Sequence, residues 1–365
     1  MKIIYWIGID DHADKWTVAQ YRGEEPQPSK EFELVPDEKG YRRLLGYLKG
    51  LEGEVRVVYE AGPCGYELYR RLTRAGYKCQ VAAPALTPRK PGERVKTNRR
   101  DAAKLARYLR SNDLTFIVVP DQDRESLRDL VRSRQSVQKD VGRMRKQIIH
   151  LLLRYGHRYR EGQAWTQRFW AWLKKVQLEG VHSRFVLTEM IGELEHRISQ
   201  LERYDEQVEL ASQKPEYQPY LAAQRTLRGI NTLSAMTILS ELGDLRRFAT
   251  APKLMAAVGV VPSEYSTSDK TNRFSITKTG NAHLRHVMVE AAWQYQRRQL
   301  LGRTIKARRK DQPKAIVEIA EKCDKRLHTR FYRLTSRNKK STVAVVAVAR
   351  ELLGFIWAIG QIAHP

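Results

Sequence analysis

The chain has few cysteines and no motif that pairs them for a metal. Its 365 residues include three, Cys64, Cys79 and Cys323, an odd count at unrelated positions. This pattern argues against a disulfide framework and a cysteine zinc site, and it predicts a reducing compartment. The N-terminal stretch becomes polar after nine residues, too early for a secretory signal, so we expect a cytoplasmic protein.

An uninterrupted apolar run of membrane-spanning length is also lacking. The most apolar stretch reads STVAVVAVARELLGFIWAIGQIA, and Arg350 and Glu351 interrupt it near its centre. A membrane-spanning helix needs about 20 predominantly apolar residues. We therefore expect a buried helix here, and no membrane among the partners.

Acidic residues are in deficit. The chain carries 66 Lys and Arg against 41 Asp and Glu, a formal net charge of +25, which favours a polyanionic partner. Residues 297–340 alone hold 16 Lys and Arg against 4 Asp and Glu. A surplus this dense suits the neutralisation of phosphates, with binding that weakens steeply as salt rises. A solvated helix face is the simpler alternative.

Three regions with different patterns follow one another. In residues 1–115, β-branched runs such as KIIYWIGI, KWTVAQYR and KEFELV alternate with helical ones, which predicts an α/β domain that opens on a three-strand meander. Residues 116–215 predict two long helices paired as an antiparallel coiled coil, with the tryptophan-rich segment 165–172 at its tip. Residues 216–365 predict an all-α domain of short helices and loops, closed by the long apolar helix.

Carboxylates mark the ends of predicted elements in the first region. Asp10 ends the strand YWIGID, Glu60 ends VRVVYE, and Asp101 lies in the first turn of the helix NRRDAAKLARYL. Mg²⁺ prefers hard oxygen ligands and keeps positions open for phosphate oxygens and water. Asp11 and Asp14 are rivals of Asp10, although Asp11 should point to the opposite side of the strand. This order of acids after a meander resembles the RNase H-like or RuvC-like nuclease fold.

Six motifs carry a more specific resemblance. They are GIDDHADKWTVA, YEAGPCGYEL, VKTNRRDAAKLARYL, LRGINTLSAMTILSELGDLRRF, VGVVPSEYSTSDK and ITKTGNAHLRHVMVEAAW. In this order, with a coiled coil between the third and the fourth, the chain resembles the DEDD-type transposases of the insertion sequence 110 family over almost its whole length.

The resemblance implies a RuvC-like domain whose four acidic residues hold Mg²⁺. Asp10, Glu60 and Asp101 match three of them, and Asn98 stands where the family usually has an acid. A carboxamide oxygen still binds Mg²⁺, more weakly than a carboxylate. The simpler interpretation of Asn98 is a helix N-cap in a box with Asp101, and the two roles are compatible.

A possible helix-hairpin-helix element lies in the last region. The segment LRGIN is followed by an apolar helix, and Gly229 would let backbone amides face a phosphate at the start of that helix. An ordinary turn between helices has the same pattern.

The segment GVVPSEYSTSDKTNRFSITKTGN places three hydroxyls together, Ser266, Thr267 and Ser268. A hydroxyl becomes a nucleophile only with a base, a metal or nearby positive charge, and here Lys270, Arg273 and Lys278 follow within a few positions. By residues alone, such a run is more often a turn.

The resemblance implies that one of these hydroxyls attacks DNA. An ungapped match falls on Thr267, whose β-methyl would crowd the reaction, so Ser266 is preferred, with Thr267 and then Ser268 behind it. The helix after this segment carries Arg285, which has the length to reach a phosphate, and His283 and His286, which are candidate proton shuttles or plain surface residues.

The function expected from the resemblance is a transposase or DNA recombinase. It would use Mg²⁺ and a phosphoserine intermediate, and an element-encoded guide RNA would direct it to its DNA. The coiled coil would form a homo-oligomer, a dimer or a tetramer. The alternatives are a metal-dependent junction endonuclease in which water attacks, and an inactive nucleic-acid-binding homologue.

Overall fold

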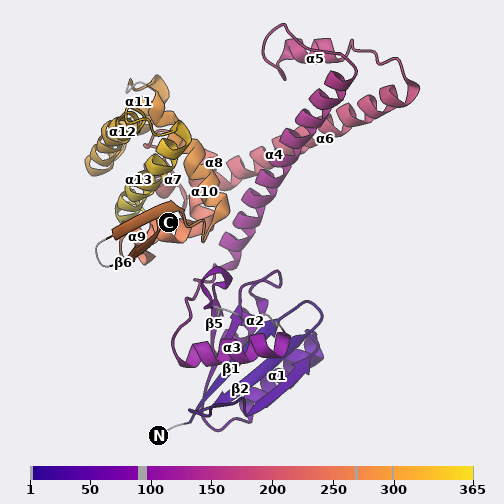
Figure 1. Ribbon diagram of the computed structural model, residues 1–365. Helices are drawn as coiled ribbons and strands as arrows, with labels where there is room; N and C mark the ends of the chain where they lie inside the picture. The colour runs from indigo at the N-terminus through magenta and orange to yellow at the C-terminus, as the bar shows by residue number, and fades with distance from the viewer. Residues whose placement is uncertain (1–2, 89–96, 268–269, 298–299, 365) are drawn as a thin grey trace. The chain divides into compact units, whose positions relative to one another are not determined.

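The computed structural model describes residues 3–88, 97–267, 270–297 and 300–364. The chain divides into two compact units, Met1–Pro120 and Asp121–Pro365 (Figure 1). The division into three regions expected from the sequence stays a prediction.

The first unit is built on a five-stranded sheet. Its strands are β1 (Ile4–Asp11), β2 (Trp16–Arg22), β3 (Lys30–Leu34), β4 (Glu54–Glu60) and β5 (Lys78–Ala82). The first three form the predicted antiparallel meander, and β4 and β5 add to β1 in parallel, giving the order β3-β2-β1-β4-β5. This mixed sheet is compatible with the RNase H-like prediction.

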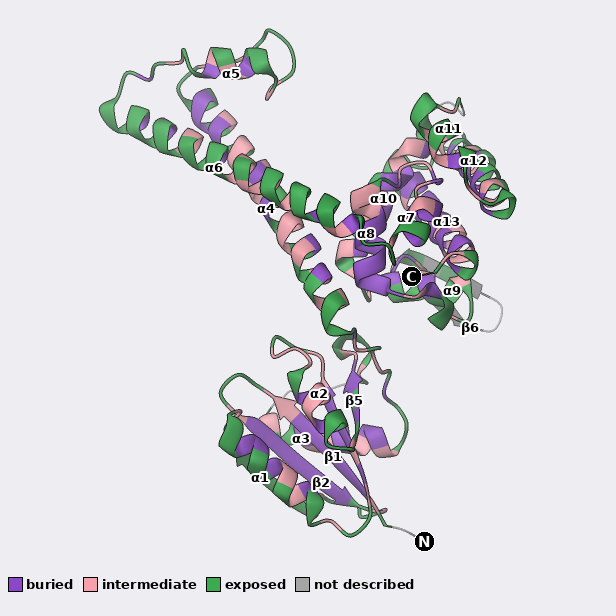
Figure 2. Cartoon of the chain, turned by 180° about the vertical axis from the view of Figure 1, so that it is seen from behind, coloured by how far each residue is buried: buried purple, intermediate pink, exposed green. Residues whose placement is uncertain are grey.

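Helices cover both faces of this sheet. On one face lie α1 (Glu38–Lys49) and α2 (Glu67–Arg74), which pack on Ile7 and Ile9. On the other lies α3 (Asn98–Arg110), which packs on Trp6 and on neighbouring side chains of β4 and β5. A short 3₁₀ turn, η1 (Pro84–Leu86), follows β5. Successive strand residues alternate between the two faces, and the strands are correspondingly buried in Figure 2.

Gly8 is the point of closest approach between β1 and α3. A Cβ added to Gly8 would lie 2.1 Å from the carbonyl oxygen of Ala102 and 2.6 Å from the amide nitrogen of Ala106. The absence of a side chain at this position therefore lets α3 lie directly on the strand.

The second unit begins with two long antiparallel helices, α4 (Gln122–Arg154) and α6 (Val181–Ser212). Along α6, Leu187, Leu194, Leu201 and Val208 recur every seven residues and lie in apolar clusters with α4. The short helix α5 (Gln167–Leu173) closes the far end, where aromatic rings stack around the buried Phe169. The predicted helical pair is thus present, and its supercoiling stays a prediction.

The remaining elements form a mainly helical body. They are α7 (Gln218–Gln224), α8 (Thr232–Leu242), η2 (Leu245–Arg247), α9 (Ala251–Val258), β6 (Pro262–Thr267), β7 (Lys270–Ile276), α10 (Ala282–Ala292), η3 (Trp293–Gln296), α11 (Arg303–Lys310), α12 (Lys314–Thr335) and α13 (Ser341–Ile362). The expectation of helices and loops alone is wrong, because β6 and β7 pair as an antiparallel hairpin.

Helix α13 is the apolar stretch singled out in the sequence. In the part of the chain that the structure describes, it is the one helix long and apolar enough to cross a membrane. Its Val348, Leu352 and Ile356 are fully buried in the core of the second unit, so it is accounted for as a core helix.

The close contact at Gly8 predicts opposite effects for two glycine substitutions. Gly8→Ala should destabilise the first unit by roughly 1–3 kcal/mol, because its methyl group would overlap the Ala102 carbonyl. Gly46→Ala, in α1 with no heavy atom within 4 Å of the added Cβ, should stabilise it by about 0.5–1 kcal/mol. Native-state hydrogen exchange of the β1 amides in the full chain measures both changes in stability. Changes of equal sign and size in the two variants would contradict the role given to Gly8.

Candidate active site and nucleic-acid interface

Asp10 and Glu60 lie at the carboxyl ends of two adjacent parallel strands. The register pairs Ile9 of β1 with Tyr59 of β4, so Asp10 and Glu60 follow as neighbours. Ile9 and Tyr59 belong to the core under α1 and α2. By the alternation of strand side chains, the two carboxylates fall on the α3 face.

The first turn of α3 carries the two other predicted oxygen donors, Asn98 and Asp101. Thr97 caps the helix, since its Oγ1 accepts a hydrogen bond from the Arg100 amide at 3.4 Å. The interpretation of Asn98 as the N-cap is therefore wrong, and Asn98 is the first helical residue. Asn98 and Asp101 are three residues apart and share a helix face. That face continues into Ala102, the residue that meets Gly8.

The rivals of Asp10 have other surroundings. Asp11 accepts a hydrogen bond from Trp16 Nε1 at 2.8 Å. Burial raises the pKa of Asp11, although its hydrogen bond to Trp16 opposes the rise. Asp14 is exposed in the turn between β1 and β2. Asp10 is mostly buried, with its Oδ2 3.6 Å from His12 Nε2.

The donor set on this face matches a divalent cation in its chemistry. Three carboxylates and one carboxamide offer the oxygen ligands that Mg²⁺ takes. Among the described residues, no group of three or more His, Cys, Asp or Glu side chains is placed to hold a metal ion. The match to Mg²⁺ therefore rests on the hard oxygen donors, to which substrate phosphates and water would add.

Two of the three hydroxyl residues, Ser266 and Thr267, are the last residues of β6. In its register, Ser266 pairs with Thr271 and Thr267 pairs with Lys270. The side chains of Ser266, Thr267, Lys270 and Arg273 lie outside the described part of the structure, as does the whole of Ser268. On the two strands, Tyr265 and Phe274 are 72% and 62% exposed. The predicted turn is therefore a strand pair that projects apolar rings into solvent.

The base of the hairpin is fastened to the end of α9. Gly259 ends that helix in the left-handed region, with φ of 72°. The amides of Thr277 and Lys278 donate to the carbonyl oxygens of Val261 and Gly259 at 2.9 and 3.1 Å. Arg285 Nη1 donates to the Val258 carbonyl oxygen at 2.8 Å. Part of the Arg285 guanidinium, predicted to bind phosphate, thus holds the hairpin base.

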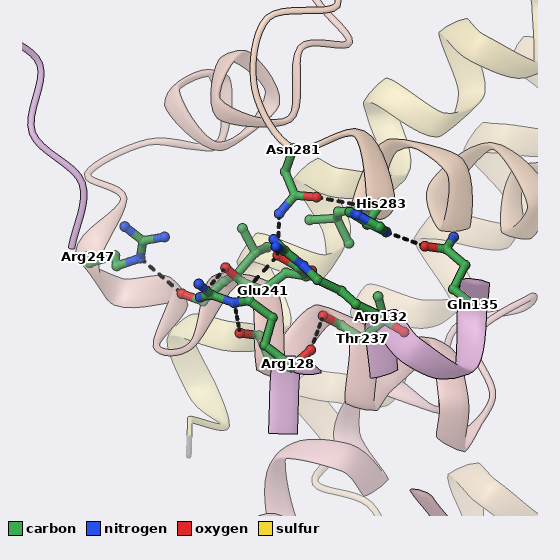
Figure 3. Close-up of polar contacts among 11 residues, drawn as sticks. Arg128, Arg132, Gln135, Thr237, Glu241, Arg247, Asn281 and His283 are labelled. Carbon is green, nitrogen blue, oxygen red and sulfur yellow. Dashed lines mark hydrogen bonds and ion pairs between the residues drawn. The ribbon is translucent and has the colours of Figure 1, made fainter. Parts of the chain in front are cut away.

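A buried carboxylate joins this region to α4. Glu241 of α8 has a side chain that is 1% exposed. It accepts hydrogen bonds from Arg132 Nε and Nη2 at 2.7 and 2.9 Å and from Asn281 Nδ2 at 2.5 Å (Figure 3). Arg128 Nε lies 3.6 Å away. Burial acts to raise the pKa of Glu241, but Arg132, Asn281 and Arg128 outweigh it and leave the pKa below its usual value.

Sequence reasoning missed this cluster. The signal available was a single carboxylate, Glu241, in the otherwise apolar and hydroxylic helix TLSAMTILSEL. A buried carboxylate requires partners, but the sequence does not say that Arg132, more than 100 positions earlier, is one of them. His283 was expected to be a proton shuttle or a plain surface residue, whereas its Nδ1 is hydrogen-bonded to Gln135 Oε1 of α4.

The turn before α8 requires glycine at position 229. Gly229 has φ of 82°, and a Cβ there would lie 2.4 Å from the Ala291 carbonyl oxygen of α10. Asn231 caps α8 by accepting from the Ser234 amide at 2.8 Å. The turn borders a pocket of about 560 Å³ whose other walls come from α4, α10 and α11.

Two family models match this chain. One, described as Transposase IS116/IS110/IS902 family, matches residues 222–307, and a transposase model of the DEDD type matches residues 7–157. Putative transposase y4qE of Sinorhizobium fredii is 39% identical over 329 residues, covering 90% of this chain and 81% of that protein. The chain belongs to the IS110 family of transposases.

Other relatives carry the same kind of name. The transposase for insertion sequence element IS1533 of Leptospira borgpetersenii is 29% identical over 352 residues, covering 93% of this chain and 99% of its own. The transposase for insertion sequence element IS1111A of Coxiella burnetii is 25% identical over 244 residues. This chain is accordingly the transposase of an insertion sequence, an enzyme that acts on DNA.

The basic segment of the transposase, residues 297–340, contains cations of two kinds. Arg309 is buried, donates to the Thr226 carbonyl oxygen at 3.0 Å and pairs with Asp324 at 2.7 Å. Arg308 donates to the Ile230 carbonyl oxygen at 3.1 Å. Lys314 is 92% exposed. The segment therefore supports the turn at Gly229 from within and also presents positive charge to solvent.

The surroundings of His283 predict an acid-sensitive stability of the transposase. Burial, followed by the positive charge of Arg132, lowers the pKa of His283. The unfolded chain, where the pKa is about 6.5, then binds more protons, so this contribution to stability is present above pH 6.5 and is lost as pH falls. We expect His283→Gln to flatten the decline in unfolding free energy between about pH 6.5 and pH 5. Urea unfolding of wild type and variant at a series of pH values measures this decline. Parallel curves of unfolding free energy against pH would contradict the prediction.

Proposed function

We propose that this transposase breaks and rejoins DNA strands through a hydroxyl of its hairpin, with Mg²⁺ held by the first unit. The observation that supports it most is the placement of Asp10 and Glu60 on neighbouring strand ends, on the face covered by α3. The family matches span both this face and the hairpin. Asp101 and Asn98 complete the donor set.

The chemistry assigned to the hairpin is a transesterification in two steps. The Oγ of Ser266 forms a bond to the phosphorus of a DNA phosphodiester, losing its proton to solvent, and one deoxyribose oxygen leaves and takes up a proton. A hydroxyl of a second strand then attacks the phosphoserine and releases the serine. Thr267 and Ser268 rank behind Ser266 for this role. Asp10, Glu60, Asp101 and the Asn98 oxygen would hold Mg²⁺, which would supply positive charge for the phosphate oxygens.

Positive groups beside the hairpin suit a nucleic-acid substrate. Lys270 and Arg273 belong to β7, and Lys278 follows it. The turn at Gly229 and the side chain of Arg285 belong to the same mainly helical body as the hairpin. Each of them already lies against the protein backbone. We assign these groups to the phosphate backbone, which positions DNA without reading its sequence.

The sequence specificity is assigned to an element-encoded guide RNA. The net charge of +25 suits an assembly that neutralises several nucleic-acid strands. The helical pair α4 and α6 is assigned to homo-oligomerisation, as a dimer or a tetramer. Val181 and Phe185 at the start of α6 are 68% and 66% exposed, which supports a contact between copies there. The assembly works in the prokaryotic cytosol or nucleoid, where DNA is present.

Trapping of the covalent intermediate tests the proposal. The full-length transposase is mixed with Mg²⁺, the RNA transcribed from the element's flank and matching DNA, and denaturing gels detect protein-linked DNA. We expect Ser266→Ala to abolish the adduct. An adduct that persists until Thr267 or Ser268 is changed reassigns the nucleophile. Cleavage without any adduct would replace the proposal with a water-using junction endonuclease.

A matched pair of variants in the first unit serves as the control for the metal face. Asp10→Asn should lower strand cleavage at least 100-fold with DNA binding retained. Asp11→Asn, one residue away and hydrogen-bonded to Trp16, should stay within a few-fold of wild type. Equal losses in both would contradict the assignment of the α3 face.

Asn98 predicts a gain of function. A carboxylate binds Mg²⁺ more strongly than a carboxamide oxygen, and Thr97 keeps the helix cap in either case. Asn98→Asp should therefore lower the Mg²⁺ concentration for half-maximal cleavage several-fold. The measurement is a Mg²⁺ titration of the cleavage rate, with Thr97 unchanged. A rise or no change in that concentration would remove Asn98 from the donor set.

A further inference from the structure

The buried Glu241 carboxylate has partners on two other elements. Arg132 and Arg128 come from α4, and Asn281 is the N-cap of α10. Removing a carboxylate from water costs several kcal/mol unless charges and hydrogen bonds replace the water. The three elements α4, α8 and α10 are therefore joined at one point (Figure 3).

Asn281 is held at each of its polar ends. Its Oδ1 accepts from the Leu284 amide at 2.9 Å, which starts α10, while its Nδ2 donates to Glu241. Its backbone amide donates to the Ala257 carbonyl oxygen at 3.2 Å. The two side-chain bonds need opposite ends of the carboxamide, so they fix its orientation.

The chain between the hairpin and Asn281 has little slack. Strand β7 ends at Ile276, and only four residues separate it from Asn281. Within them, Thr277 and Lys278 are bonded to the segment after α9. A Cβ on Gly280 would lie 2.1 Å from the Ala257 carbonyl oxygen. Movement of Asn281 would therefore move the base of β7.

A second contact runs along the same side of α4. Gln135 Oε1 is hydrogen-bonded to His283 Nδ1, one residue past the start of α10. Arg128 Nε also donates to the Ser240 carbonyl oxygen at 3.1 Å. Helix α4 thus contacts α8 and the start of α10 through polar groups at three successive turns.

We propose that Glu241 is a positioning residue for the transposase reaction, which through Asn281 and Arg132 fixes the hairpin of residues 262–276 against α4. This role rests on the proposed function of the hairpin. Glu241 acts through Asn281 and does not touch DNA.

Two substitutions at Asn281 test the link without removing the helix cap. Asn281→Ser keeps a good N-cap but is too short to reach Glu241. Asn281→Asp also keeps the cap but sets a second carboxylate against Glu241. Both should lower the single-turnover cleavage rate at least tenfold and leave the Kd for DNA within twofold. Both should speed hydrogen exchange in residues 277–284. The control is Asp37→Ser, which replaces the α1 cap in the first unit and should change neither quantity.

A reciprocal exchange provides the rescue. Glu241→Gln combined with Asn281→Asp restores one carboxylate and one carboxamide with donor and acceptor reversed. The double variant should cleave faster than Asn281→Asp alone, which loss of fold does not predict, but slower than wild type, because Arg132 Nη2 loses the carboxylate oxygen that accepts from it.

The outcomes separate this role from the function on which it rests. An unchanged cleavage rate in Asn281→Ser, while Ser266, Thr267 and Ser268 remain essential, would overturn the positioning role alone. Wild-type cleavage after alanine replaces all three hydroxyl residues would overturn the proposed function, and with it any need to position the hairpin. A double variant that cleaves no faster than Asn281→Asp alone would also count against Glu241.

Discussion

The desolvation of one carboxylate constrains much of the second unit. Glu241 is enclosed on a helix whose other residues are apolar or hydroxylic, so the charge is tolerable only with cations and amides in contact. The hydrogen bonds from Arg132 and Asn281 to this carboxylate fix where α4 crosses α8 and where α10 begins. The base of the hairpin is bonded to the end of α9 and runs directly into the N-cap of α10. The position of the hairpin therefore depends on where α9 ends and where α10 begins. A polar requirement in the core thereby determines the placement of a surface element.

In the first unit the main constraint is the close packing of helix α3 on strand β1. Gly8 allows α3 to lie on β1, and strand alternation then decides which carboxylates share the face that α3 covers. Asp10 is on that face and Asp11 is not, although they are adjacent in sequence. Because a shift of one residue in β1 would exchange them, the chemistry of the site depends on strand register as much as on residue type.

Patterns that report burial were predictable from the sequence, and patterns that depend on distant partners were not. The meander and the acids at strand ends follow from apolar alternation that stops at Asp10 and Glu60, and α13 follows from its apolar length. The hairpin was missed because PSEYST and KTNRFSI are polar, so no apolar face marks them as strands. Thr97 and Asn98 are both good caps, and one residue of helix boundary separates the two interpretations. The partners of Glu241 lie far away in sequence.

Only part of the net positive charge is available to bind nucleic acid. Some arginines of the second unit have their partners inside the protein: Arg309 is buried against Asp324, and Arg308 donates to a backbone carbonyl. These cations release no counterions when a nucleic acid binds. The salt dependence of binding reports only charges that meet phosphate, and exposed lysines like Lys314 are available for that. The cations of α11 and α12 are therefore of two kinds: the buried ones hold the body of the second unit together, and the exposed ones remain available to nucleic acid.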